Sequence, residues 1–421
     1  MRGAIHRIGE ELHRVEGGEV LTHPLQDTVA VDDEKWSSRW AELPEITRPR
    51  VAHVLHSDSS GGGPVSVSRM LKYFHKTQDQ VMLAGGHGRI YATCQELGIP
   101  FYEIPLETKR KALLLGFWKL VWQLRRVRPD VLVVHGQWAG PLGAMAGRLA
   151  QVPKIIYVAR WPSFYTSWDL FRVVRNHLSE RVPCRLADWT VTLCESSRYQ
   201  YFIRRHVDED RLLTIPNSIS VEDRPTAEQV ANFRKQWNWR DEHCNVVSVG
   251  RLSDQKRVMW LVRAWPEVIR RCPQARLWIV GDGGRRAFLQ NLARELEIEA
   301  SCVFTGELPM GMVAIASSDV VAMTSVYEGM SNIVMESFLC GKPIVASDVD
   351  GIRDTIERDV DGFLVRPGDI QSFADRLIQL IEDPTLRRKM GVAGRKSIQR
   401  YDVPLVMREY EKLFGAALAK A

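Results

Sequence analysis

A strand–helix–strand segment around position 330 limits the folds open to this chain more than any other stretch. Asp319–Met323 and Pro343–Ala346 are short apolar runs of the kind that buried parallel strands have. Between them, Ile333–Leu339 leaves room only for a brief helix, which Gly341 would end. Such a unit belongs to an open α/β sheet, and ligands of these sheets bind beyond the carboxyl ends of the strands. We therefore expect a binding site in the loop before this helix.

The loop before the predicted helix carries groups suited to a phosphorylated sugar or a nucleotide. Glu328 lies at the carboxyl end of the strand, and Glu336 lies further on, inside the helix. Carboxylates accept hydrogen bonds from hydroxyl groups, and backbone amides at a helix start favour an anion. The alternative is an ordinary strand–helix–strand unit with two solvated glutamates. The residues expected to offer amides or to cap the helix are Gly329, Met330, Ser331 and Asn332.

The two glutamates are followed by Cys340–Ser347, which reads Cys-Gly-Lys-Pro-Ile-Val-Ala-Ser. This combination resembles the donor-site signature of the retaining glycosyltransferases of family 4, and weaker similarity extends from about Val51 to Tyr401. The resemblance implies the GT-B fold, an α/β fold with two Rossmann-like parallel-sheet domains that face each other across a cleft. It also implies a nucleotide diphosphate sugar as donor, with no metal ion and no other cofactor. Where the family usually has an aromatic residue and a proline, this chain has Met330 and Ser331.

The composition is that of a soluble globular protein with room for two domains. The chain has 421 residues, of which 45% are hydrophobic and 26% charged, and its formal net charge is +6. An excess this small does not indicate nucleic acid as a partner. The sequence has no long apolar run and no apolar core at its amino terminus, so we expect neither a membrane span nor a secretory signal. Seven cysteines without a Cys-x-x-Cys pair favour reduced thiols in the cytoplasm over disulfides or zinc.

A glycine-rich loop follows the first strand that the sequence predicts. The strand is Val51–His56, and a helix is expected from about Val65 to His75. Between them lie Gly62 and Gly63, and glycines at this point allow the backbone to approach a ligand closely. The spacing is not Gly-x-Gly-x-x-Gly, which disfavours a dinucleotide site. The alternative is a plain strand–helix turn, but in the family that the chain resembles a glycine-rich loop faces the cleft.

Strands and helices alternate along the rest of the chain, which predicts parallel sheets. The further strands of the first half are expected at 81–84, 130–134, 154–158 and 188–193. The expected organisation is a lead-in of unknown role over residues 1–49, an acceptor-side domain over 50–220, a nucleotide-sugar-binding domain over 221–400, and a carboxyl-terminal helix over 401–421 that returns to the first domain.

Two basic residues follow the first strand of the second half. Arg251 and Lys256 lie in a loop after Asn245–Val249, where their charges would neutralise a diphosphate. On charge alone a solvated basic loop would explain them equally well, but the pair resembles the diphosphate-binding arginine and lysine of the family. The same resemblance implies that backbone near Glu307 and Leu308 receives the nucleotide base.

The resemblance also implies roles for the site residues. Arg251 and Lys256 would stabilise the leaving diphosphate together with the amides at the helix start, and Glu328 would orient the sugar ring. Glu336 would hold the ribose hydroxyls. We therefore expect Glu328, Arg251 and Lys256 to support catalysis directly, and we assign no protein nucleophile.

Residues 109–126 combine basic and aromatic side chains on one predicted helix. Leu114, Phe117, Val121 and Leu124 form a stripe that is sufficient to cover a sheet, and Leu115, Trp118 and Trp122 form a second stripe beside it. Two tryptophans ringed by lysines and arginines suit an interfacial helix on an anionic membrane, which would place the protein peripherally on the inner face of the cytoplasmic membrane. The alternative is a well-buried helix with a basic outer face.

His135 and Arg160 each follow a predicted strand whose carboxyl end should face the cleft, and Trp161 adjoins Arg160. We place all three in an acceptor or sugar pocket, although a lone histidine at such a position is more often structural. Relatives often carry a histidine near Arg160 that reaches the donor sugar. A guanidinium suits carboxylates and phosphates, so Arg160 predicts an anionic group on the donor or acceptor beyond the diphosphate. The alternative is that Arg160 pairs with a local acid such as Asp169.

These features together predict a retaining, metal-independent glycosyltransferase of glycan, polysaccharide or glycolipid biosynthesis. Its partners would be a UDP- or GDP-linked sugar donor and a glycan or glycolipid acceptor. A glycoside hydrolase using Glu328 and Glu336 as its carboxylate pair is one alternative, but it leaves Arg251 and Lys256 without a role. A non-catalytic module that binds nucleotide sugars is another. A Rossmann dehydrogenase lacks its fingerprint.

Overall fold

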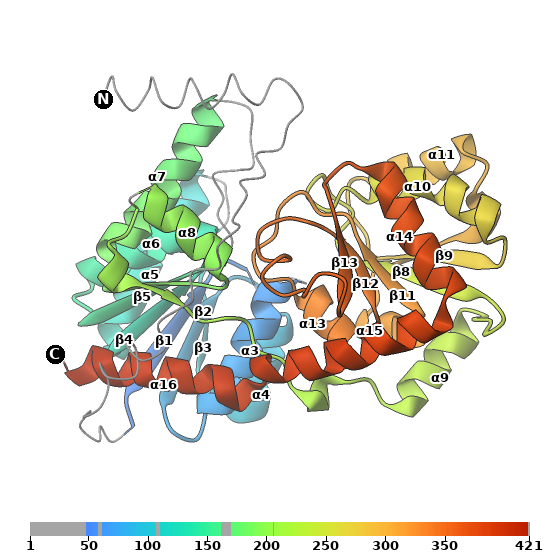
Figure 1. The fold of residues 1–421 in the computed structure, drawn as a ribbon. Helices are drawn as coiled ribbons and strands as arrows, with labels where there is room; N and C mark the ends of the chain where they lie inside the picture. The colour runs from blue at the N-terminus through green and yellow to red at the C-terminus, as the bar shows by residue number, and fades with distance from the viewer. Residues whose placement is uncertain (1–47, 58–60, 107–109, 161–169, 205, 420–421) are drawn as a thin grey trace. The chain divides into compact units, whose positions relative to one another are not determined.

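A computed structural model describes residues 48–57, 61–106, 110–160, 170–204 and 206–419 (Figure 1). The lead-in expected over residues 1–49 therefore lies almost entirely outside the described residues, as does Trp161. The described part contains two parallel β-sheets, one of seven strands and one of six, with helices between successive strands except β12 and β13. The prediction of an α/β fold with two parallel sheets is confirmed.

The first sheet has the strand order β3-β2-β1-β4-β5-β6-β7. Its strands are β1 (Arg50–Leu55), β2 (Asp79–Ala84), β3 (Phe101–Glu103), β4 (Val131–His135), β5 (Lys154–Ala159), β6 (Trp189–Thr192) and β7 (Leu212–Thr214). The accompanying helices are α3 (Gly62–Phe74), α4 (Arg89–Leu97), α5 (Arg110–Val127), α6 (Gly136–Leu149), α7 (Leu170–Leu186) and α8 (Glu195–Ile203). The order reverses between β1 and β4, which pair with each other in parallel.

The second sheet has the order β10-β9-β8-β11-β12-β13. Its strands are β8 (Cys244–Val249), β9 (Ala275–Val280), β10 (Cys302–Gly306), β11 (Val320–Met323), β12 (Ile344–Ser347) and β13 (Gly362–Val365). Its helices are α9 (Ala227–Gln236), α10 (Val258–Arg271), α11 (Arg286–Glu295), α12 (Met312–Ser317), α13 (Asn332–Leu339), α14 (Ile370–Glu382) and α15 (Pro384–Ser397). Here the order reverses between β8 and β11.

The strands are apolar along nearly their whole length because helices cover both faces of a parallel sheet. In the second sheet, Trp265 of α10 is fully buried and its indole N–H donates to Ser301 Oγ at 2.9 Å. The carboxyl-terminal helix α16 (Val403–Ala419) packs on α3, where the rings of Phe414 and Phe74 meet edge to face at 5.4 Å. The seven cysteines are all free thiols.

Candidate donor site

The site begins where the strand order of the second sheet reverses. In open α/β sheets such a reversal leaves a crevice beyond the carboxyl ends of the two central strands, and ligands bind there. Arg251 follows β8 and Glu328 follows β11, and these two strands are hydrogen-bonded neighbours. The topology therefore brings together two loops that lie far apart in the sequence and that carry the expected diphosphate and sugar groups.

Lys256 and Glu328 form an ion pair across these loops. Lys256 Nζ donates to Glu328 Oε1 at 2.6 Å, and the two side chains are only 19% and 10% exposed. From the sequence we expected Lys256 to contact the diphosphate and Glu328 the sugar ring, whereas in the structure the two side chains contact each other. An ammonium group has three N–H donors, so Lys256 keeps two for a ligand while Glu328 fixes its position.

Arg251 differs from Lys256 in having no counterion. Its side chain is exposed, and it forms no hydrogen bond or ion pair with any other residue in the described ranges. Burial raises the pKa of the Tyr327 phenol, and the charge of Arg251 lies close enough to offset part of this effect. Arg251 is therefore a cation that a ligand can recruit without breaking an existing contact.

The turn after β9 supports the loop that carries Arg251. Leu252 N–H donates to Asp282 O at 2.8 Å, and Gly250 N–H donates to Val280 O at 2.9 Å. Gly281 has φ +129°, and a Cβ on it would lie 2.1 Å from Gly250 O. The glycine at position 281 therefore allows two backbone segments to pack closely, which gives this glycine-rich turn a structural role.

Gly281→Ala is expected to destabilise the protein by about 2 kcal/mol or more, because alanine is strained at this φ and meets the carbonyl of Gly250. It should also weaken nucleotide diphosphate binding by displacing the Arg251 loop. Gly284→Ala in the same turn is the matched control, since a Cβ there meets no atom within 4 Å. Thermal unfolding and nucleotide titration of both variants check this. Equal effects of the two substitutions would contradict it.

The loop from Gly329 to Asn332 leads into α13 without side-chain capping. Ser331 is the N-cap residue, but its hydroxyl points to Met323 Sδ at 3.5 Å and caps no amide. The N–H groups of Gly329, Met330 and Ser331 donate to no other residue that the structure describes. These amides at the helix start thus remain available to an anion.

The glycine-rich loop of the first half contacts this helix start. Asn332 Nδ2 donates to Gly62 O at 3.3 Å, and a Cβ on Gly62 would lie 2.8 Å from that same nitrogen. A side chain at Gly62 would therefore displace Asn332. The structure thus brings Gly62 and Asn332 together, and Gly63 follows Gly62 in the chain.

Met330 contributes its side chain as well as its backbone, which the sequence analysis did not expect. It is buried, its sulfur accepts from Asn217 N–H at 3.1 Å, and its carbonyl accepts from Asn217 Nδ2 at 3.2 Å. Asn217 Oδ1 in turn accepts from Ser66 Oγ at 2.9 Å. Asn217 thus joins the loop before α13 to helix α3, and it was not among the site residues expected from the sequence.

Glu336 lies on α13, partly buried, and its carboxylate has no hydrogen bond within the described residues. Burial raises the pKa of Glu336 from 4.5 to about 7, and the positive charge of Arg69 offsets part of this effect. A carboxylate held in this way has acceptor capacity to spare, which suits hydroxyl groups of a ligand.

Arg69 is a second residue that sequence reasoning missed. It is buried on the inner face of α3, where its Nε donates to Asp223 Oδ2 at 2.9 Å and its guanidinium donates to Ser218 O at 2.6 Å. The available signal was an arginine among the apolar residues of that face, beside Val67, Met70 and Leu71. Arg69 fixes the segment around Asn217 and lies close to Glu336.

His135 and Arg160 lie together at the carboxyl ends of β4 and β5. Arg160 donates to His135 Nδ1 at 3.3 Å, and His135 Nε2 lies 3.2 Å from His53 Nδ1. Burial and the neighbouring charge of Arg160 lower the pKa of His135 well below its usual value. Trp161 lies outside the described residues, so its predicted place in this pocket has no structural counterpart here.

Glu307 and Leu308 directly follow β10, at the edge of the second sheet. Gly306 O, directly before them, accepts from Gly281 N–H at 2.8 Å. The turn that supports the Arg251 loop therefore also anchors the segment expected to receive the base.

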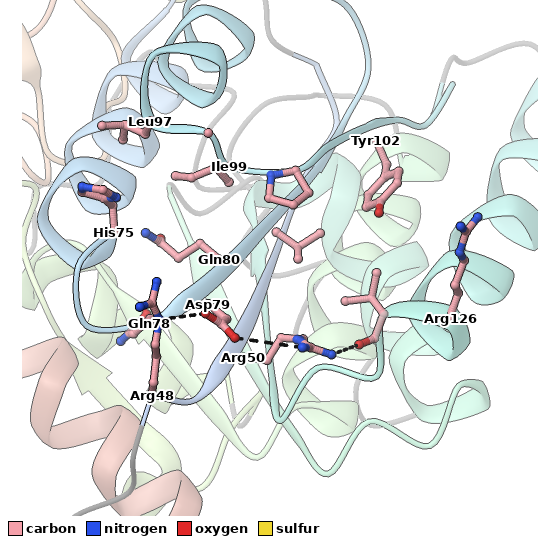
Figure 2. A pocket seen from close by; sticks show the side chains of 14 residues that line it. Arg48, Arg50, His75, Gln78, Asp79, Gln80, Leu97, Ile99, Tyr102 and Arg126 are labelled. Carbon is pink, nitrogen blue, oxygen red and sulfur yellow. Dashed lines mark hydrogen bonds and ion pairs between the residues drawn. The ribbon is translucent and has the colours of Figure 1, made fainter.

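A pocket of about 420 Å³ lies at the opposite, amino ends of β1 and β2 (Figure 2). Two of its arginines are already engaged: Arg48 pairs with Asp79 at 2.8 Å, and Arg50 donates to Val127 O at 2.9 Å. This position does not match the ligand-binding ends of a parallel sheet. Within the described ranges, no group of three or more histidine, cysteine, aspartate or glutamate residues is placed to hold a metal ion.

Two family models match the chain in succession. Residues 60–223 match the model described as Glycosyltransferase Family 4, and residues 229–397 match the model described as Glycosyl transferases group 1. The second match contains Arg251, Lys256, Glu328 and Glu336. The chain belongs to the group 1 glycosyltransferases. This membership favours a transferase over the glycoside hydrolase and over a module without catalysis.

Relatives of this group 1 glycosyltransferase are found in archaea and bacteria. The chain is 25% identical over 300 residues to an uncharacterized glycosyltransferase of Methanocaldococcus jannaschii, which covers 69% of this chain and 76% of the relative. It is also 25% identical over 303 residues to the UDP-Gal:alpha-D-GlcNAc-diphosphoundecaprenol alpha-1,3-galactosyltransferase of Escherichia coli, with 69% and 76% covered.

The crystal structure of Anabaena HepE in complex with UDP and glucose superposes on this glycosyltransferase with a TM-score of 0.75. The match has 21% sequence identity and covers 88% of this chain and all of HepE. The fold is therefore GT-B, as the sequence predicted.

Proposed function

We propose that this glycosyltransferase moves a sugar from a nucleotide diphosphate sugar to an acceptor hydroxyl with retention of anomeric configuration and without a metal ion. The observation that carries the proposal is the cation arrangement beside α13. Lys256 is held by Glu328, Arg251 has no counterion within the described residues, and the amides of the α13 start are unbonded. These groups together match a diphosphate that gains charge as its bond to the sugar breaks.

The proposed roles follow from this arrangement. Arg251 and Lys256 neutralise the leaving diphosphate, while the backbone of Gly329, Met330, Ser331 and Asn332 and of the Gly62–Gly63 loop lines the phosphate and sugar region. Glu336 accepts the ribose hydroxyls, and the segment at Glu307 and Leu308 receives the base. Glu328 orients the sugar ring from its place beside Lys256.

The domain organisation that goes with these roles is also a proposal. Residues 50–220 would form the acceptor-side domain, residues 221–400 the nucleotide-sugar domain, and the helix after residue 401 would return to the first domain. Support comes from the sheet topology, because each sheet is completed by strands from one of these ranges. The contact of Phe414 with Phe74 supports the position of the last helix.

The relatives guide the choice of donor and acceptor. HepE was crystallised with UDP and glucose, and the Escherichia coli relative is named for a UDP-galactose donor and a diphosphoundecaprenol acceptor. We therefore propose a UDP- or GDP-linked sugar donor and a glycan or glycolipid acceptor.

A product analysis tests the reaction type. The purified protein is incubated with its donor and an acceptor in EDTA, and the anomeric proton of the product is followed by NMR from the first minutes. Transfer with the donor's own configuration is the expected result. An inverted product, a requirement for added metal, or release of free sugar without an acceptor would each overturn the corresponding part of the proposal.

Helix α5 supports a second element of the proposal, a peripheral contact with an anionic membrane. Leu115, Trp118 and Trp122 are 72%, 60% and 57% exposed, so the predicted second stripe is not buried. Leu114, predicted in the sheet-covering stripe, is 64% exposed and joins them. Lys119, Arg125 and Arg126 carry positive charge on the same helix. An exposed aromatic and basic surface fits a lipid interface better than a protein core.

Within the described residues no helix is both long enough and apolar enough to cross a bilayer. The double variant Trp118→Ala/Trp122→Ala is expected to lower binding to vesicles containing phosphatidylglycerol by about tenfold or more. Tyr199→Ala/Phe202→Ala on α8 is the matched control, because these aromatics are also exposed but lie outside α5. Vesicle co-sedimentation measures both. Binding that is weak in the wild type or unchanged in the α5 variant would contradict a membrane role.

A further inference from the structure

Arg160 is a shielded cation whose neighbours are neutral. It follows β5, its side chain is partly buried, and its Nε atom is buried without a hydrogen-bond partner. Its one hydrogen bond within the described residues goes to the ring nitrogen of His135. Burial lowers the pKa of Arg160 to about 10, so the guanidinium is still charged at neutral pH.

Among the residues that the structure describes, the groups around Arg160 carry no compensating charge at neutral pH. Burial lowers the pKa of His53 to about 4, and the pKa of His135 is also well below its usual value, so both rings are neutral. Burial raises the pKa of Tyr410, on α16 near Arg160, to about 12, so this phenol is neutral too. A partly shielded charge without a counterion is costly, because buried charges in proteins are usually paired. An anionic ligand would supply the partner that Arg160 lacks among the described residues.

The two histidines orient the guanidinium. An arginine only donates, so His135 Nδ1 accepts from Arg160 and its proton lies on Nε2, directed to His53 Nδ1. His135, the last residue of β4, therefore holds one edge of the Arg160 guanidinium through this hydrogen bond. The Nε edge is left unbonded, and an ideal Cβ on Gly63 would lie 3.7 Å from Nε.

The glycine-rich loop relates Arg160 to the donor site. Gly62 contacts Asn332 at the start of α13, while Gly63 lies against Arg160. Two consecutive residues thus contact the start of α13 and this cation. Arg160 follows β5 of the first sheet, whereas Asn332 begins α13 of the second half.

We infer that Arg160 binds an oxyanion carried by the transferred sugar or by the acceptor, in addition to the donor diphosphate, so that the substrate is a uronic acid donor or a phosphate-bearing acceptor. This inference rests on the proposed function and deepens it. The shared chemistry is a planar or tetrahedral oxyanion that meets the free edge of the guanidinium fork.

Paired probes test the inference. In the donor arm, the glucose and glucuronic acid esters of the nucleoside diphosphate that the protein binds are compared by calorimetry. In the acceptor arm, geranyl phosphate and geraniol are titrated into protein saturated with the bare nucleotide. We expect one anionic probe to bind about tenfold or more tightly than its neutral counterpart, from the added charge-assisted hydrogen bonds. Which arm shows the preference identifies the source of the oxyanion.

Arg160→Gln should abolish that preference while leaving affinity for the bare nucleotide unchanged, and Arg160→Lys should retain part of it. Asp169→Asn is the companion variant, because Asp169 is the acid named above as a local partner. The inference is overturned if the wild type binds the anionic and neutral probes equally in both arms. It is also overturned if the preference for the anionic probe persists in Arg160→Gln or appears only in Asp169→Asn. Failure of the proposed function is distinguishable, since the bare nucleotide would then bind to none of these proteins.

Discussion

Lys256→Ala is expected to slow sugar transfer by about 100-fold or more, because it removes a preorganised cation from the leaving diphosphate. It should also destabilise the protein, since Glu328 is only 10% exposed and would lose its counterion. Arg251→Ala should slow transfer comparably but leave stability nearly unchanged, because Arg251 is exposed and has no ion pair in the described structure. Steady-state kinetics and thermal unfolding of both variants check the two expectations.

Arg263→Ala provides the control for lost positive charge. Arg263 is an exposed arginine on α10, the helix that directly follows the Arg251–Lys256 loop. Its replacement should leave both transfer and stability near wild type. If the two single variants Lys256→Ala and Arg251→Ala both kept turnover close to that of the wild type, the assignment of these residues to the diphosphate would be refuted.

Glu336→Gln is expected to weaken nucleotide sugar binding by about tenfold or more, because the amide replaces a charged acceptor for the ribose hydroxyls. The same change should stabilise the ligand-free protein by about 1–2 kcal/mol at pH 8, because it removes a partly buried carboxylate that has no hydrogen bond in the described structure. Glu328→Gln should instead lower transfer while sparing the free nucleotide. Calorimetric titration and thermal unfolding separate these effects.

The pH dependence of the Glu336→Gln effect has a defined sign. The pKa of Glu336 is raised from 4.5 to about 7 in the folded protein, so ionising this carboxyl opposes folding. That cost is absent below 4.5, grows between 4.5 and 7, and is complete above 7. The stabilisation from the glutamine should therefore be larger at pH 8 than at pH 5.5. An equal gain in stability at pH 5.5 and pH 8 would contradict the proposed cost of ionising Glu336. Equal loss of affinity for the bare nucleotide in Glu336→Gln and Glu328→Gln would contradict the division of roles.

Local sequence patterns predicted the central strands and the end of α13, whereas α3 begins three residues before the expected Val65. Apolar runs such as 244–249 and 320–323 are buried by their own composition, and Gly341 ends α13 with a positive φ of 66°. The three-residue strands β3 and β7 were missed, because Phe101–Glu103 and Leu212–Thr214 are too short to show a pattern. Their formation depends on pairing with β2 and β6.

The contacts between distant segments could not be predicted from the sequence. Lys256 and Glu328 meet because β8 and β11 are neighbours in the sheet. Local sequence patterns do not predict the order of the strands. Asn217 and Arg69 act through partners more than 100 residues away, at Met330 and Ser218 respectively. Asn217 was not recognised from the sequence at all, and the only signal of Arg69 was a charge on an apolar helix face.

One titration tests the central claim, that the loops after β8 and β11 bind a nucleotide diphosphate sugar. Thermal unfolding is measured for the wild type, for Arg251→Ala/Lys256→Ala and for Arg263→Ala with a panel of UDP-, GDP- and ADP-linked sugars. We predict that sugars linked to one of these nucleotides stabilise the wild type and Arg263→Ala against unfolding by about 2.7 kcal/mol at 100 times the dissociation constant. The double variant should lose most of this stabilisation. Stabilisation of the double variant equal to that of the wild type, or no stabilisation of the wild type by any nucleotide sugar, would contradict the claim.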